Sequence, residues 1–231
     1  MSFHSLLLVF LLMSGCAHGP ILKKTDGGQT LLAHACEPGS PTKSVKGSVW
    51  LKVKSKDASG QFPAWVDAKS PDQLRLEVTN PLGGTEAVIT VSQNSYEIQN
   101  GKKHTQVEKG YGSWGGIPLE WATDLFLGKI PCPSKESLSD ATYAVSPEGS
   151  LTVAIAGSLQ GAEQRYEYRF RSWGGAPWPE ALTWERRGSL AMKVEFKFDD
   201  PDETTHSPKK WEAKSIQGEV KARWRERDVS R

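Results

Sequence analysis

Residues 190–198 read Leu-Ala-Met-Lys-Val-Glu-Phe-Lys-Phe and place a larger apolar side chain at every second position. A two-residue repeat is the period of a β-strand, because successive side chains of a strand point to opposite faces of its sheet. The segment therefore predicts a strand with one buried apolar face and one charged, solvated face.

The same alternation recurs along the interior of the chain. It occupies residues 45–54, 61–68, 74–79, 87–91, 142–145, 151–155 and 165–171. Residues 118–129 differ, because an early Pro is followed by apolar residues at helical spacing, which predicts one helix. We expect a mainly β (α+β) fold, a single curved antiparallel sheet forming an unclosed half-barrel, with few helices covering an apolar cavity. A fully packed interior is the alternative that the sequence leaves open.

The amino terminus is typical of an exported lipoprotein. Residues 6–13 form an apolar run long enough for an export signal and too short to span a bilayer, and Ser14 and Gly15 then precede Cys16. We expect residues 1–15 to be a signal peptide and Cys16 to carry the lipid anchor.

The rest of the chain is expected to contain one domain. Residues 16–44, rich in Gly, Pro, Ser and Thr, predict a lipidated N-terminus and flexible tether, residues 45–215 the folded domain, and residues 216–231 a basic, solvated C-terminal tail. The formal net charge of +2 is too small to indicate the strongly basic surface typical of nucleic-acid-binding proteins, so we expect no binding of nucleic acid. We expect a monomer.

Two cysteines remain once Cys16 is lipidated. Cys36 and Cys132 are an even pair in a compartment that permits disulfides, so they form either one bridge or two free thiols. His34 stands near Cys36, but no second ligand pair has the spacing of a zinc site, and we expect no metal.

The candidate catalytic and ligand-binding motifs lack the surrounding sequence that their functions require. Residues 110–116 match Gly-x-Gly-x-x-Gly, yet no strand, helix and parallel strand surround them as a dinucleotide site requires. The acidic residues at 199–203 lack a calcium-loop pattern and predict a solvated loop. We expect neither a cofactor nor an enzyme.

Residues 80–86, Asn-Pro-Leu-Gly-Gly-Thr-Glu, carry a more specific signal. Turn chemistry explains the Pro and the Gly residues but not the Leu. With residues 74–79 before them, they resemble the protruding loop of the LolB outer-membrane lipoprotein receptors of the LolA/LolB-like lipoprotein-localisation family. The export signal and residues 117–119, 127–131 and 190–198 are also similar, so the resemblance covers most of residues 45–200.

The resemblance implies a lipid-anchored outer-membrane protein that faces the periplasm. Such a protein accepts acylated lipoproteins from a periplasmic LolA-like carrier and inserts them into the outer-membrane lipid. Leu82, between Pro81 and Gly83, would be the residue that promotes membrane insertion. The apolar face that accepts acyl chains is predicted to consist of Val49, Leu51, Leu76, Val78, Val194 and Phe196.

Residues 110–116 depart from that family, because glycines replace a helix expected to cover the cavity. Two alternatives stay open. Leu82 could fold back onto the sheet edge, and the chain could be a lipid-anchored structural or assembly module that binds a periplasmic partner without lipid transfer.

Overall fold

The structure is a computed structural model that describes residues 26–37, 42–56, 59–101, 107–156, 162–188 and 191–230. Cys16 and the expected signal peptide, residues 1–15, lie outside the described residues, as does Leu190. Within the described ranges, no helix has the length and apolar character needed to cross a membrane.

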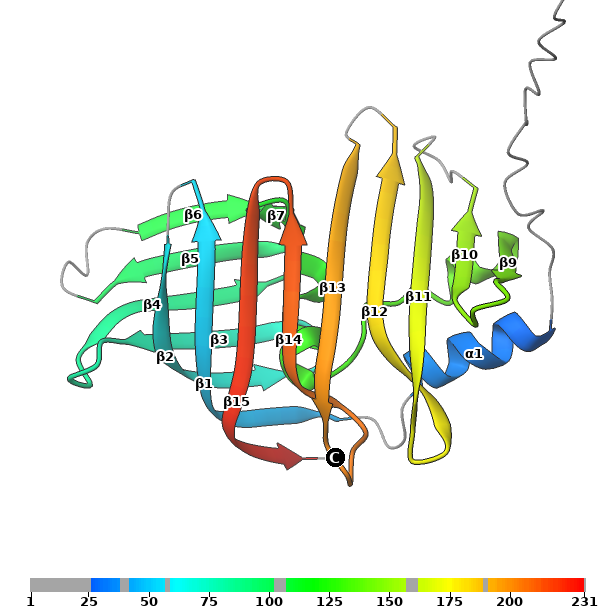
Figure 1. The fold of residues 1–231 in the computed structure, drawn as a ribbon. Coiled ribbons are helices and arrows are strands. Elements are labelled where there is room, and N and C mark those ends of the chain that lie inside the picture. Colours follow the sequence, from blue (N-terminus) through cyan, green and yellow to red (C-terminus); the bar gives the residue numbers. More distant parts are fainter. Residues whose placement is uncertain are drawn as a thin grey trace, which may run out of the picture.

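One antiparallel sheet dominates the fold (Figure 1). It contains 13 strands in the order β6-β5-β4-β3-β2-β1-β15-β14-β13-β12-β11-β10-β9, and its end strands do not pair with each other, so the sheet is open as expected. The strands are β1 (Ser44–Ser55), β2 (Ser59–Lys69), β3 (Gln73–Thr79), β4 (Thr85–Ser92), β5 (Ser95–Asn100), β6 (Val107–Tyr111), β9 (Ala141–Val145), β10 (Leu151–Ile155), β11 (Glu163–Trp173), β12 (Ala176–Arg187), β13 (Met192–Pro201), β14 (Pro208–Ser215) and β15 (Gly218–Ser230). A separate pair consists of β7 (Ser113–Trp114) and β8 (Ile117–Pro118).

The sheet has two halves, joined where the first strand pairs with the last. β1 and β15 run antiparallel along almost their whole length, from Ser44 opposite Ser230 to Ser55 opposite Gly218. Strands β1 to β6 form the first half and β9 to β15 the second, and Figure 1 shows β3 to β6 turned away from the direction of β11 to β14. This turn curves the sheet and gives it an inner face.

The helices cover that inner face. They are α1 (Asp26–Cys36), η1 (Leu119–Trp121), α2 (Ala122–Leu127) and η2 (Glu136–Asp140). The helix predicted within residues 118–129 is present as η1 and α2, and α2 packs on β1, β2 and β3. Gly128 ends α2 with a φ of 78°, where a Cβ atom would lie 2.5 Å from Nη2 of Arg227. The left-handed backbone and the crowding both favour glycine here.

Aromatic side chains fill the inner face of the second half. The Trp121 ring stands edge-on to Trp184 and Phe196, with centroid distances of 4.8 and 5.6 Å. Tyr168 is fully buried, and its hydroxyl donates a hydrogen bond of 3.0 Å to the Pro131 carbonyl. Such edge-to-face contacts between buried rings stabilise a packed core.

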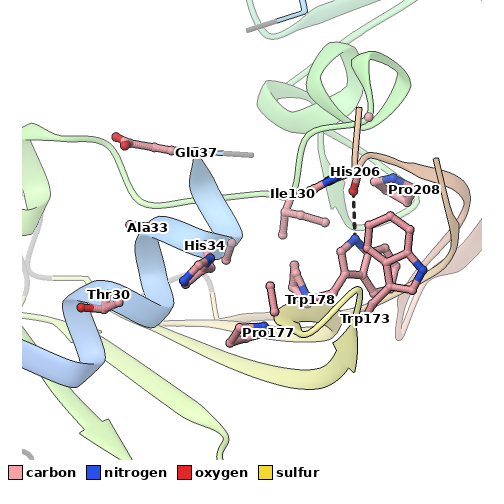
Figure 2. Close-up of a pocket in the computed structure, with 14 residues that line it drawn as sticks. Thr30, Ala33, His34, Glu37, Ile130, Trp173, Pro177, Trp178, His206 and Pro208 are labelled. Carbon is pink, nitrogen blue, oxygen red and sulfur yellow. Dashed lines mark hydrogen bonds between the residues drawn. The ribbon is translucent and has the colours of Figure 1, made fainter. Parts of the chain in front are cut away.

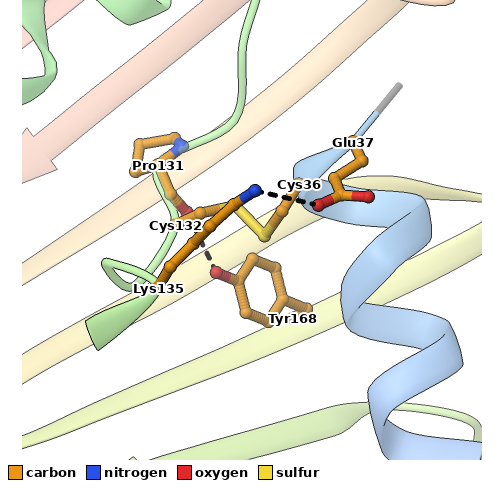
Figure 3. Close-up of a disulfide and its surroundings, with 6 residues drawn as sticks. All are labelled: Cys36, Glu37, Pro131, Cys132, Lys135 and Tyr168. Carbon is orange, nitrogen blue, oxygen red and sulfur yellow. Dashed lines mark hydrogen bonds and ion pairs between the residues drawn. A yellow bond between two sulfur atoms is a disulfide. The ribbon is translucent and has the colours of Figure 1, made fainter. Parts of the chain in front are cut away.

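Part of the expected tether is folded. Residues 26–36 form α1, which packs on β9, β10 and β12 through buried Leu32 and Ala35. Cys36 is bonded to Cys132, 96 residues away, and a 3.9 Å ion pair joins the neighbouring Glu37 and Lys135 (Figure 3). The tether prediction was wrong for this segment, because a helix too short to be stable alone gains tertiary contacts and a covalent link.

The expected basic tail is a central strand. β15 pairs with β1 on one side and β14 on the other, and Ala222 and Trp224 are buried on the inner face. Arg227, expected in solvent, donates a 3.2 Å hydrogen bond to the Leu127 carbonyl at the end of α2. Partial burial lowers the pKa of Arg227, and Asp202 opposes that shift. The prediction of a solvated tail was wrong because the positive charges alternate with inward apolar residues.

Candidate functional site

An apolar cavity of about 970 Å³ lies beneath the first half of the sheet. Strands β1 to β5 supply one wall, helix α2 covers it, and the β14–β15 hairpin closes one side. Strands β1 to β5 contribute the apolar lining residues Leu51, Val53, Phe62, Leu74, Leu76, Val78, Ala87, Ile89, Val91 and Ile98. A volume near the upper end of small-molecule sites, with mostly apolar walls, suits a long apolar ligand.

The structure brings together only half of the predicted lining residues. Leu51, Leu76 and Val78 line the cavity. Val49, Val194 and Phe196 do not line it; all three are buried, and Phe196 lies against the Trp121 ring. The prediction was wrong for these three because every strand shows the same alternation, which does not reveal which inward-facing residues border the cavity and which are covered by other side chains.

A glycine-rich strap, residues 110–118, crosses one side of the cavity. Gly110 lies so close to Tyr96 that a Cβ atom would come within 2.2 Å of the ring. The Gly112 amide donates a 2.8 Å hydrogen bond to the Asn94 carbonyl, and the Ser215 hydroxyl donates to the Gly115 carbonyl. Trp114 and Ile117 of the strap line the cavity. The glycines therefore let the strap pack closely against the strands on both sides.

Few polar groups reach the apolar cavity. The Tyr96 hydroxyl donates a 3.1 Å hydrogen bond to Glu108, and both residues line the cavity. Sequence reasoning missed Tyr96, Phe62 and Trp114 as lining residues. The sequence held one signal for Trp114. It is an aromatic residue beside glycines, in a segment without the alternation of a strand.

Asn80 builds the protruding loop between β3 and β4. Its side-chain oxygen accepts hydrogen bonds of 2.9 Å from the amides of Leu82 and Gly84, and its amide nitrogen donates to Glu86 at 3.0 Å. Gly83 has a φ of 87°, which a larger residue rarely adopts. The loop is therefore held by side-chain hydrogen bonds typical of an Asx turn, independently of any contact by Leu82.

Leu82 stands at the tip of this loop with 96% of its surface exposed, so it does not fold back onto the sheet edge. Pro81 and Gly83 beside it are exposed as well. The cavity extends to the base of the loop, because Val78 and Glu86, on the two strands that the loop joins, both line it. An exposed apolar residue thus stands at one end of the apolar cavity.

A smaller cavity of about 340 Å³ lies between α1 and the β11–β12 hairpin (Figure 2). Trp178 there donates a 2.9 Å hydrogen bond to the His206 carbonyl, and the Arg171 guanidinium lies 4.8 Å from the Trp178 ring centroid. No group of His, Cys, Asp and Glu side chains suited to a metal ion occurs in the part of the chain that the structure describes.

Solved structures share this arrangement of sheet and helices. A LolA superfamily protein from Nitrosomonas europaea has a TM-score of 0.51 at 11% sequence identity, covering 88% of this chain and 94% of that protein. A DUF1329 family protein from Desulfovibrio piger has a TM-score of 0.56 at 8% identity, covering 90% and 94%. The fold is LolA-like. The likeness supports the LolA-like fold and does not single out LolB, the receptor that the loop resembles.

A putative outer membrane lipoprotein-sorting protein domain from Vibrio parahaemolyticus matches with a TM-score of 0.48 at 8% identity, covering 88% of this chain and 91% of that one. No protein-family model and no curated protein matches the sequence. Within its LolA-like fold, this chain closes the cavity with the glycine-rich strap at the position where the resemblance predicts a helix.

Proposed function

We propose that this chain accepts the acyl chains of lipoproteins from a periplasmic LolA-like carrier and inserts them into the outer membrane. In this proposal the apolar cavity holds the acyl chains, and Cys16 anchors the protein to the membrane through its own lipid. The transfer needs no covalent chemistry and no cofactor. The protein works at the periplasmic face of the outer membrane.

The observation that carries the proposal is the position of Leu82 at one end of the apolar cavity. The cavity offers apolar walls over about 970 Å³, and Leu82 exposes 96% of its surface at the tip of a loop whose base lines that cavity. A large apolar side chain held in water by the fold gains free energy when it enters a membrane, about 1.5 to 3 kcal/mol for full burial. The loop would thus bring the loaded cavity to the bilayer.

Transfer without an energy source must run downhill. The cavity would therefore bind acyl chains more tightly than the carrier does and less tightly than the bilayer does. A cavity with a few polar groups, such as the Tyr96 and Glu108 pair, holds acyl chains less well than a purely hydrocarbon phase.

Replacing Leu82 by Glu tests the role of the loop. Release of a lipoprotein into liposomes should slow by at least about tenfold, because the variant loses the 1.5 to 3 kcal/mol of membrane burial and adds a charge. Transfer from the carrier to the variant, measured by the change in carrier-bound lipoprotein, should stay unchanged, since Leu82 lies outside the cavity.

Val145→Glu is the matched control, because Val145 is an exposed apolar residue at the end of β9 and is not among the residues that line the apolar cavity. If release depends on Leu82 specifically, the control variant should release at the wild-type rate. An unchanged release rate for Leu82→Glu would show that the loop has no role in release. Acyl binding by the cavity is tested separately.

A further inference from the structure

A second cavity, of about 1020 Å³, lies on the other side of the glycine-rich strap. We call it the charged cavity, since its walls contain Glu120 from η1, Glu185, Arg186 and Arg187 from β12, and Lys193 and Glu195 from β13. Charged residues make up a larger part of its lining than of the apolar cavity, which lies beneath the first half of the sheet and is lined mostly by apolar residues.

The two cavities adjoin each other. Ser113 and Pro118 of the strap and Ile216 and Gln217 of the β14–β15 hairpin line both of them. The strap and the hairpin are held together there, because the Ser215 hydroxyl donates to Gly115 and accepts from the Gln217 amide at 2.9 Å. A molecule with one apolar end and one polar end can therefore occupy both cavities at once.

Most charges in the charged cavity are already paired with each other. Lys193 lies 3.5 Å from Glu185 and 3.7 Å from Glu195, and Arg187 lies 3.8 Å from Glu185. Glu120 and Arg186 differ, because neither forms an ion pair within the described ranges of the chain. The two groups still influence each other, since Arg186 lowers the pKa of Glu120 while burial raises it more strongly. Lys214 also lines the charged cavity and forms no ion pair in the described part of the chain, so one carboxyl group, one guanidinium group and one ammonium group remain available to a ligand.

The fold fixes the backbone position of Glu120 and the side chain of Arg186. Glu120 directly precedes Trp121, whose ring is buried against Trp184 and Phe196. The Arg186 guanidinium lies 5.9 Å from the Trp184 ring centroid, and its Nη2 donates to the Met192 sulfur at 3.0 Å. The aromatic core therefore positions Arg186, and a ligand would bind its guanidinium group without ordering a long flexible side chain.

We propose that the charged cavity binds the peptide that follows the lipidated cysteine of a cargo lipoprotein while the acyl chains occupy the apolar cavity. This inference rests on the proposed function, because it assumes that acyl chains enter the apolar cavity. Arg186 donates hydrogen bonds to peptide carbonyl groups, and Glu120 accepts them from peptide amides. The cargo is then recognised by its polar part as well as by its lipid.

The size of the charged cavity favours a peptide over a lipid headgroup. Its volume of about 1020 Å³ is at the upper end of cavities that hold drug-sized ligands, whereas a phospholipid headgroup consists of only a few atoms. An extended peptide offers a repeating series of carbonyl and amide groups, which suits a wall that presents a guanidinium donor on β12 and a carboxyl acceptor on η1.

Two probes with the same lipid separate the two cavities. One is a diacylglyceryl cysteine amide, and the other carries the same lipid followed by a short uncharged peptide. We expect the wild-type chain, produced from Ala17 onward so that every described element is present, to bind the lipopeptide more tightly. Arg186→Gln and Glu120→Gln should each weaken lipopeptide binding about tenfold, the effect of losing a hydrogen bond to a charged group, and leave binding of the lipid alone unchanged.

Arg169→Gln serves as the matched control, because Arg169 is exposed on the neighbouring strand β11, one residue from inward-facing Tyr168. This variant should bind the lipid and the lipopeptide as the wild type does.

Equal binding of the two probes by the wild type, with both cavity variants unaffected, would overturn the inference and leave the proposed function intact. Failure of the wild type to bind either probe would instead refute the proposed function. Phosphatidylethanolamine serves as a third probe, for a lipid headgroup. If the two cavity variants bind this probe more weakly and bind the lipopeptide as the wild type does, the charged cavity belongs to a headgroup and the inference is overturned.

A cross-linking measurement on the wild-type chain tests the same inference without a variant that could misfold. A lipopeptide with a photoreactive group in its peptide should cross-link the wild-type chain at Ala191, Met192, Lys193 or Glu195, which line the charged cavity. Mass spectrometry would locate the site. Cross-links found only outside the residues of the charged cavity would place the peptide in solvent and contradict the inference.

Discussion

The Ala87→Trp variant is expected to lose most of its affinity for acyl chains and to keep its stability. Ala87 lies on β4 and lines the apolar cavity, so a Trp side chain there would occupy space that an acyl chain needs. If it displaces two methylene groups, the loss is about 1.6 kcal/mol, or about 15-fold in affinity. Titration with a fluorescent fatty acid measures the affinity, and urea unfolding measures the stability.

Thr90→Trp is the control for this substitution, because Thr90 is exposed on the same strand one residue from inward-facing Val91 and Ile89. It should bind the probe as the wild type does. The stability of Ala87→Trp is itself informative. In a fully packed interior the added ring would cost about 1 to 3 kcal/mol by overpacking, so a destabilised variant with unchanged binding would contradict an acyl-binding cavity.

Removing the disulfide should cause a large loss of stability. Cys36 and Cys132 are 96 residues apart, and the chain-entropy model assigns about 4.7 kcal/mol to the closure of a loop of that order. Measured losses on removal of native disulfides are about 2 to 5 kcal/mol. We expect the Cys36→Ser, Cys132→Ser double variant to lower the free energy of unfolding by that amount.

A reducing agent provides the control for the double variant. It should destabilise the wild-type chain to the level of the variant and leave the variant itself unchanged. Helix α1 should lose protection first in hydrogen exchange, because its other anchors are limited to contacts such as those of Leu32 and Ala35. Equal stability of the oxidised and reduced wild type would show that the bridge does not support α1.

Strands with a strict alternation could be predicted from the sequence because their pattern has a single structural explanation. Residues 190–198 predicted β13, and residues 45–54 predicted β1. Strand β12 was missed because Pro177 and Pro179 interrupt its beginning, and proline usually marks a turn or an edge strand. Here a bulge in the pairing of β11 and β12 between Arg169 and Phe170 lies opposite that region.

Strand β15 had the pattern of a strand and was assigned to a tail because of its charge. Val220, Ala222 and Trp224 alternate with Lys221, Arg223 and Arg225, so the periodicity was present. The pairing of the last strand with the first decides its central place in the sheet, and a sequence read one segment at a time does not contain that long-range information.

The candidate site was predictable where one residue stood apart from its surroundings. An apolar Leu82 between turn residues has no structural role in a loop, and the structure shows it exposed. The lining of the cavity was predictable only in part, because Leu76 and Phe196 belong to equally apolar strands. Their different surroundings follow from Trp121, which fills the space against Phe196 and leaves the first half of the sheet open.

The measurement that tests the central claim most directly is the binding of a fluorescent fatty acid to the chain from Ala17 onward. Saturable binding near one probe per molecule is the predicted result, with energy transfer from Trp114 and Trp211 in the cavity wall that the Trp114→Phe variant reduces. No binding by a sample with a cooperative unfolding transition would contradict the account, and the chain would then be better explained as a lipid-anchored module that binds a protein partner.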